Sequence, residues 1–101
     1  MNRPLDPDIV LEYCCSRFNI PKWIVISKEK RNKEEVKLRK IIVLLLLELT
    51  DLRKEEIAKI FNRKRSLVDY YRKSLKKNDF VAVACINDCK KIKEEIKNLY
   101  E

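Results

Sequence analysis

The chain has 101 residues, a formal net charge of +8, and neither glycine nor histidine. Without glycine, neither a phosphate-binding P-loop nor a GxGxxG dinucleotide-binding turn can form. Without histidine, the chain lacks the commonest general base and any Ser/His or Cys/His pair. We therefore expect a protein that is not an enzyme and has no cofactor. This length predicts a single domain, residues 1–101, with a modest core.

Two segments hold the positive charge. Residues 28–40 contain seven basic and three acidic side chains, and residues 53–77 contain ten basic and three acidic ones, whereas the remaining segments are neutral or acidic. Clustered Lys and Arg side chains favour a phosphate backbone as the partner. An anionic membrane is the rival partner, but basic segments bind membranes best beside exposed apolar faces. Here the apolar faces are needed for the core, so we expect no membrane partner.

The sequence also predicts a compartment. The N-terminal stretch MNRPLDPDIV has no apolar core of a signal peptide. The apolar run IIVLLLL at residues 41–47 is shorter than the roughly 20 residues that span a bilayer. We expect a cytoplasmic, nucleoid-associated protein whose thiols stay reduced.

The first half of the chain predicts three helices. Asp6 and Pro7 are a typical helix start, and the first helix is expected to reach about Phe18. The segment PKWIVIS then predicts a short helix with Trp23 and either Ile24 or Ile26 turned inward; a strand is the alternative, but no partner strand is evident. After a basic loop at residues 27–33, Asn32 caps a third helix that runs to about Leu49 and is apolar nearly all round, which predicts a central position.

Residues 53–77 have the spacing of a helix-turn-helix. Ile57 and Phe61 lie four apart and can pack inward, while the small Ala58 between them allows a second helix to cross closely. Asn62 occupies the turn, where the backbone needs positive φ and Asn is among the few residues that tolerate it. Val68 and Tyr71 resume the apolar spacing in the second helix, predicted at about residues 64–77. The alternative is an ordinary amphipathic helix pair with a solvated basic face.

The last predicted helix starts after Asp79 and reaches about Tyr100. Its apolar positions alternate three and four apart, at Ala82, Cys85, Cys89, Ile92, Ile96 and Leu99. This seam could be half of a coiled coil and give a weak homodimer. Packing against the third helix is the favoured interpretation, because the seam covers under three heptads. The cysteines are expected in the core rather than at a metal, since the adjacent pair at residues 14–15 lacks the usual ligand gap.

In this order of elements the chain resembles the C-terminal DNA-binding domain of the bacterial replication initiator DnaA. The likeness begins in DIVLEYCCSRFNI and SKEKR and continues without a gap through LRKIIVLLLLELTDLRKEEIAKIFN. The positions that match the family's pattern are Arg39, Leu45, Glu48, Leu49, Thr50, Glu56, Ile57, Phe61 and Asn62. The resemblance implies an all-α fold, a compact bundle of about six helices around a long central helix.

The resemblance is weakest at the start of the recognition helix. The family's R-D-H-T-T-V appears here as RKRSLV at residues 63–68, with one residue deleted before it. Arg63 and Val68 match, and Ser66 replaces one hydroxyl by another, but the Asp, the His and the second Thr are absent. The resemblance therefore implies the docking of the recognition helix and of the basic loop, where Arg31 matches, but not the family's base specificity.

We therefore expect binding to double-stranded DNA, with the recognition helix in the major groove and the basic loop on phosphates. Arg65 is the leading candidate for reading guanine. The full set of predicted contacts is Lys28, Lys30, Arg31, Arg63, Lys64, Arg65, Ser66, Tyr70, Arg72 and Lys73. Two alternatives stay open: a protein–protein interaction module of a replication or transcription complex, and a DNA-binding piece of a larger initiator, transposase or mobile-element protein.

Overall fold

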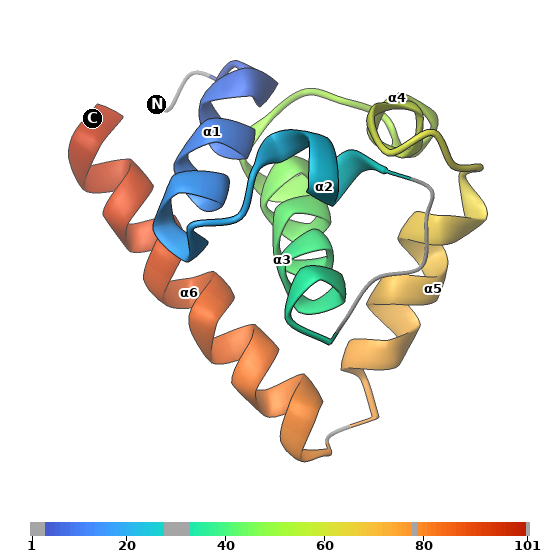
Figure 1. The fold of residues 1–101 in the computed structure, drawn as a ribbon. Helices are drawn as coiled ribbons and strands as arrows, with labels where there is room; N and C mark the ends of the chain where they lie inside the picture. The colour runs from blue at the N-terminus through green and yellow to red at the C-terminus, as the bar shows by residue number, and fades with distance from the viewer. Residues whose placement is uncertain (1–3, 28–32, 78, 101) are drawn as a thin grey trace.

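The structure is a computed structural model and describes residues 4–27, 33–77 and 79–100. These residues form helices and no strand, which confirms the all-α prediction (Figure 1). None of the described helices is both long enough and apolar enough to cross a membrane. In chain order the helices are α1 (Pro7–Phe18), α2 (Lys22–Ile26), α3 (Lys33–Leu49), α4 (Lys54–Ile60), α5 (Ser66–Leu75) and α6 (Phe80–Tyr100).

Helix α3 is the centre of the fold, as its sequence predicts. It packs against each of the other five described helices (Figure 1). Residues at successive positions around the helix are therefore fully buried: Leu38, Ile41, Ile42, Val43, Leu45 and Leu46. A helix that is apolar nearly all round is stable only when it is covered on every side. The cap expected at Asn32 lies outside the described residues.

Helix α1 begins and ends with local signals that the sequence supplies. The Asp6 carboxylate accepts a hydrogen bond from the Asp8 N–H at 2.9 Å, and Pro7 occupies the first turn. At the other end Asn19 adopts a left-handed conformation with φ 55°, and its N–H bonds back to the last turn. The Leu5 N–H also donates to the Leu49 carbonyl at 2.8 Å, so the segment just before α1 is fixed to the end of α3.

The prediction for α2 was wrong about Trp23 and missed Val25, whereas Ile26, one of the two predicted isoleucines, packs against the core. Trp23 is 68% exposed, whereas Val25 is fully buried, and Ile24 and Ile26 are half-buried. Residues two apart on a helix point about 200° apart. Because α2 has only five residues, it can turn one side chain fully toward α3, and Val25 occupies that position while Trp23 faces away.

A buried arginine joins α2 to α3. Arg39 is only 4% exposed; its Nε donates to the Val25 carbonyl at 3.0 Å and its Nη2 to the Ser27 carbonyl at 3.2 Å. The last carbonyls of a helix have no partner within the helix, and a guanidinium can donate to two of them at once. Arg39 therefore fixes the C-terminal end of α2, and with it Ser27, the first residue of the basic loop 27–33.

Helix α6 packs along α3, as favoured for its apolar seam. Asp79 caps it, since its Oδ1 accepts from the Ala82 N–H at 2.8 Å. The seam positions from Ala82 to Ile96 are buried, but Leu99 is 63% exposed, so the predicted seam is one residue too long. Because the core of the same chain already covers this face, α6 does not offer the seam to a second copy.

The four cysteines are free and buried, which confirms their assignment to the core. Cys14 and Cys15 lie on α1, and Cys85 and Cys89 lie on α6. Burial raises the pKa of Cys14 and of Cys89 to about 12, and it raises the pKa of the other two thiols as well. A thiolate loses its hydration on burial, so the neutral thiol is favoured.

These thiols are expected to be unreactive in the folded protein. Only the thiolate attacks a disulfide reagent, and a pKa near 12 leaves almost no thiolate at pH 8 for Cys14 and Cys89. We expect slow reaction with Ellman's reagent under native conditions and prompt reaction of all four thiols in guanidinium chloride. Prompt reaction of Cys14 or Cys89 in the native protein, located by mass spectrometry, would contradict this packing.

Candidate nucleic-acid interface

Helices α4 and α5 are joined by a turn that depends on Asn62. This residue has φ 56°, as predicted, in the left-handed region that most side chains avoid. The Asn62 N–H donates to the Lys59 carbonyl at 3.0 Å and the Arg63 N–H donates to the Ala58 carbonyl at 2.9 Å. This pair of bonds is the Schellman motif, which ends a helix and redirects the chain sharply. In a chain without glycine, Asn62 supplies the backbone conformation that this motif needs.

The apolar residues of this helix pair lie where their spacing predicts. Ile57, Ala58 and Phe61 are fully buried, and Val68 and Tyr71 join them from α5. Ala58 has the smallest side chain of the group, which suits the close crossing of α4 and α5. The buried stripe on α5 fixes which side of that helix faces the solvent.

Helix α5 is shorter than predicted. It spans Ser66–Leu75 rather than residues 64–77. Lys64 and Arg65 precede it and accept, through their carbonyls, the hydrogen bonds of the first turn from Leu67 and Val68 at 2.9 and 3.0 Å. The Schellman turn uses the residues just before them, so the helix starts only after the chain has reversed.

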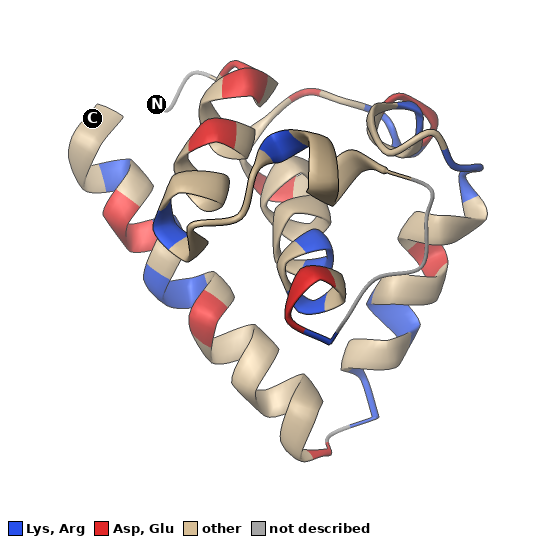
Figure 2. Cartoon of the chain, viewed as in Figure 1, with Lys and Arg blue, Asp and Glu red and all other residues tan. Residues whose placement is uncertain are grey.

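All of the predicted contact residues that the structure describes are exposed. They lie at the start of α5 and along its outward side, and they are Arg63, Lys64, Arg65, Ser66, Tyr70, Arg72 and Lys73. Figure 2 shows basic residues on the turn between α4 and α5 and along α5. Several of these side chains line one shallow hollow on α5, together with Asp69 and Lys76. Lys28, Lys30 and Arg31 lie outside the described residues.

Two ion pairs join α4 to α5 and to Arg65 just before it, and the periodicity of the sequence does not predict them. Lys54 Nζ lies 2.8 Å from Asp69 Oδ1, and Arg65 Nη1 lies 3.3 Å from Glu55 Oε1. The hydrogen bond from Lys54 lowers the pKa of the Asp69 carboxyl. One signal was present in the sequence: a Lys-Glu pair on one helix, and an Arg and an Asp four residues apart on the next. Pairing them requires knowing which edges of the helices meet.

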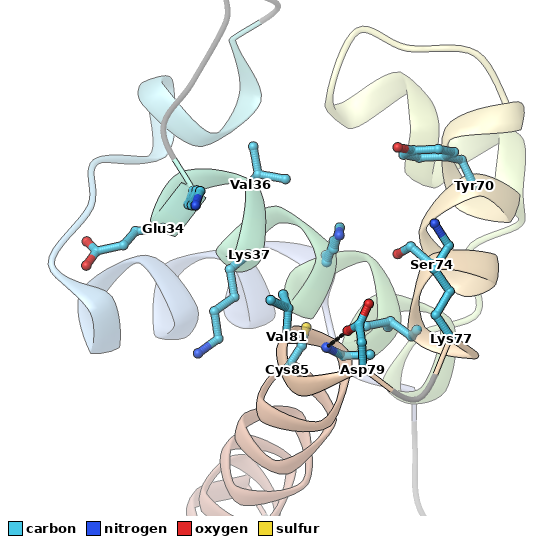
Figure 3. Close-up of a pocket in the computed structure, with 13 residues that line it drawn as sticks. Glu34, Val36, Lys37, Tyr70, Ser74, Lys77, Asp79, Val81 and Cys85 are labelled. Carbon is cyan, nitrogen blue, oxygen red and sulfur yellow. Dashed lines mark hydrogen bonds between the residues drawn. The ribbon is translucent and has the colours of Figure 1, made fainter.

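A groove of about 520 Å³ borders the opposite edge of α5, between that helix and the first turns of α3 and α6. Figure 3 shows Tyr70 and Ser74 extending from α5 toward it. Val36, Val81 and Ala82 give it apolar walls, and four lysines line it: Lys33, Lys37, Lys40 and Lys77. The positive charge of α5 therefore continues onto the start of α3, where the basic loop 27–33 ends.

Comparison with known proteins decides the family. The family model described as the helix-turn-helix of the bacterial DnaA protein matches residues 7–74, from α1 to the end of α5. The chain belongs to the DnaA helix-turn-helix family. Two similar relatives are the chromosomal replication initiator proteins DnaA of Mycoplasma genitalium and Mycoplasma pneumoniae, each 36% identical over 66 residues.

The match covers most of this chain but only a small part of each DnaA relative. It covers 65% of this chain but only 15% of either relative, so the chain spans a small part of their length. The family match stops at residue 74, before α6 begins at Phe80. The DnaA resemblance therefore holds for the helix-turn-helix and the helices that support it.

The Schellman turn generates a stability prediction. A β-branched residue in the left-handed region is costly, so Asn62→Val is expected to lower the free energy of unfolding by about 1–2 kcal/mol. Asn62→Gly is the matched control, because it removes the Cβ and keeps the conformation accessible; it is expected to stay within about 1 kcal/mol of the parent. Urea unfolding followed by circular dichroism measures both changes. Equal stability of the Val and Gly variants would rule out a strict requirement for positive φ.

Proposed function

We propose that this chain binds double-stranded DNA, with α5 in the major groove and the basic segment 27–33 on the phosphates of a flanking strand. The observation that carries the proposal is the exposed basic side of α5 within a helix-turn-helix of the DnaA family. In this motif the N-terminal residues of the second helix contact base edges. Here Ser66 begins the helix and Lys64 and Arg65 directly precede it, while Lys73 follows on the same side and can reach a phosphate or a base.

The way in which the basic segment 27–33 is anchored supports its proposed role in phosphate binding. Its first residue, Ser27, is held through its carbonyl by Arg39, and its last residue, Lys33, begins α3 beside the groove that borders α5. A segment that is anchored at both ends to the helical core, with one end beside α5, can place several cations on one phosphate strand at low entropic cost. Lys28, Lys30 and Arg31 are the cations proposed for this role, and Arg63 and Arg72 would assist them from the helix-turn-helix.

The biological role is proposed more broadly. The relatives are named as chromosomal replication initiators, so we propose that DNA binding by this chain serves the initiation of replication or its regulation, on a chromosome or a mobile element. The recognition motif RKRSLV departs from the family's pattern, and we therefore propose a target sequence of its own.

The direct test is fluorescence anisotropy with labelled duplex DNA across a salt series. Random duplexes measure electrostatic binding, and duplexes enriched from a random pool measure specificity. We expect affinity to fall steeply with salt and to rise on an enriched sequence. The absence of binding to any duplex at low salt would refute the proposed function and direct the search to a protein partner.

Two substitutions separate base reading from phosphate contact. Arg65→Ala is expected to reduce the ratio of affinities for enriched and random DNA by about 5- to 150-fold, the discrimination carried by one bidentate contact to guanine. Arg31→Ala is expected to weaken binding to both DNAs about equally and to reduce the salt slope by about one. Lys90→Ala, an exposed change on α6, is the control and is expected to change neither. Equal effects of the Arg65 and Arg31 changes would contradict this division.

A further inference from the structure

Asp69 occupies a position on α5 that faces any DNA docked there. It is the fourth residue of the helix and is exposed, with Ser66 one turn before it and Lys73 one turn after it on the same outward side. All three line the shallow hollow on α5. In helix-turn-helix proteins the N-terminal half of this helix approaches the base edges. A carboxylate here therefore lies among the proposed contact residues rather than at the rim.

The charge of Asp69 opposes the basic surface around it. It is the single acidic residue of α5, and Arg65, Arg72 and Lys73 belong to the same basic zone. On a surface that served only to attract phosphates, a carboxylate would weaken binding by repulsion. The position of this carboxylate is therefore better explained by a role other than the electrostatic attraction of phosphates.

The carboxylate is also held in place. Lys54 on α4 donates to Oδ1 at 2.8 Å, and this hydrogen bond lowers the pKa of Asp69, so the group is ionised at neutral pH. Within the described part of the chain, Oδ2 accepts no hydrogen bond from a side chain or from the backbone. A fixed carboxylate with an unused oxygen is a pre-organised acceptor.

We infer that Asp69 determines specificity at the proposed interface, by accepting a hydrogen bond from the exocyclic amino group of a cytosine in the major groove. This inference rests on the proposed function. Cytosine presents its N4 amino donor there, whereas guanine presents only acceptors and thymine an acceptor and a methyl group. Adenine also presents an amino donor, N6, but its N7 acceptor lies beside that donor and repels a carboxylate oxygen. A carboxylate accepts only, so an acceptor opposite it leaves both groups unpaired and repelling, which rejects the wrong base.

The spacing between Arg65 and Asp69 gives the recognition a pattern. The four residues from Arg65 to Asp69 correspond to a helical rise of about 6 Å, and one base pair advances about 3.4 Å, so the two side chains address base pairs about one or two steps apart. Arg65 selects guanine and Asp69 selects cytosine. The ion pairs with Glu55 and Lys54 hold the two side chains on the same edge of α5 before DNA arrives.

A purely structural role for Asp69 makes a different prediction. If the carboxylate only ties α5 to α4, then breaking the bridge from either side has the same effect. Lys54→Met breaks the bridge and leaves the carboxylate, whereas Asp69→Ala removes both. This pair of variants distinguishes recognition from bracing, because both lose the bridge and only one loses the acceptor.

The experiment selects duplexes from a random pool with the parent chain and then measures anisotropy on every single base-pair change of the enriched site. For the parent we expect one position at which cytosine is preferred by about 5- to 150-fold. In Asp69→Ala the base preference is lost at this position alone. Random DNA binds more tightly to this variant, because a negative charge has been removed. In Lys54→Met the cytosine preference persists but is weaker, because the carboxylate remains and is no longer held by Lys54. Circular dichroism checks that each variant is folded.

The opposing outcomes are distinct. An unchanged base profile in Asp69→Ala, or the same changed profile in Lys54→Met, overturns the assignment while leaving DNA binding intact. Sequence-independent binding by the parent also overturns it, and the proposed DNA binding then survives as a non-specific activity. No binding by the parent refutes the proposed function itself, and the assignment with it.

Discussion

The fold depends on covering α3. Its side chains are apolar on almost every side between Ile41 and Leu47, and removing them from water is the main stabilisation available to a domain of this size. Each of the other described helices supplies part of that cover, so their apolar stripes are fixed by what α3 needs. The orientation of α5 follows from this, since Val68, Tyr71 and Leu75 face inward and the polar side is left for solvent.

The polar side of α5 is then limited by its two neighbours. On one edge α4 contributes Lys54 and Glu55, which pair with Asp69 and Arg65. On the other edge the lysine-lined groove separates α5 from the first turn of α3. The presented surface is therefore a basic strip that contains one carboxylate, Asp69, and it is bordered by the lysines of the groove. Such a strip suits a partner with a uniform anionic backbone and a varied interior edge.

The sequence was sufficient where structure follows from local periodicity. The ends of α1 and α3, the buried pairs of the helix-turn-helix and the left-handed Asn62 all follow from spacing and backbone preference. The sequence was insufficient where burial or pairing of a side chain depended on residues far away in the chain. Trp23 and Val25 are both apolar, and only the position of α3 decides between them. The bond from Lys54 to Asp69 spans fifteen residues and depends on the crossing of two helices, which periodicity does not specify.

The two left-handed asparagines have a consequence for the unfolded chain. Asn19 and Asn62 make turns at which glycine is the usual residue, and the sequence contains no glycine anywhere. Glycine contributes the largest backbone entropy to a denatured ensemble, so a chain without it has fewer conformations to lose on folding. Each asparagine accepts some strain in the native state and, in return, narrows the denatured ensemble by about 0.4–1 kcal/mol. Part of the stability of this domain therefore comes from the reduced conformational entropy of its denatured state.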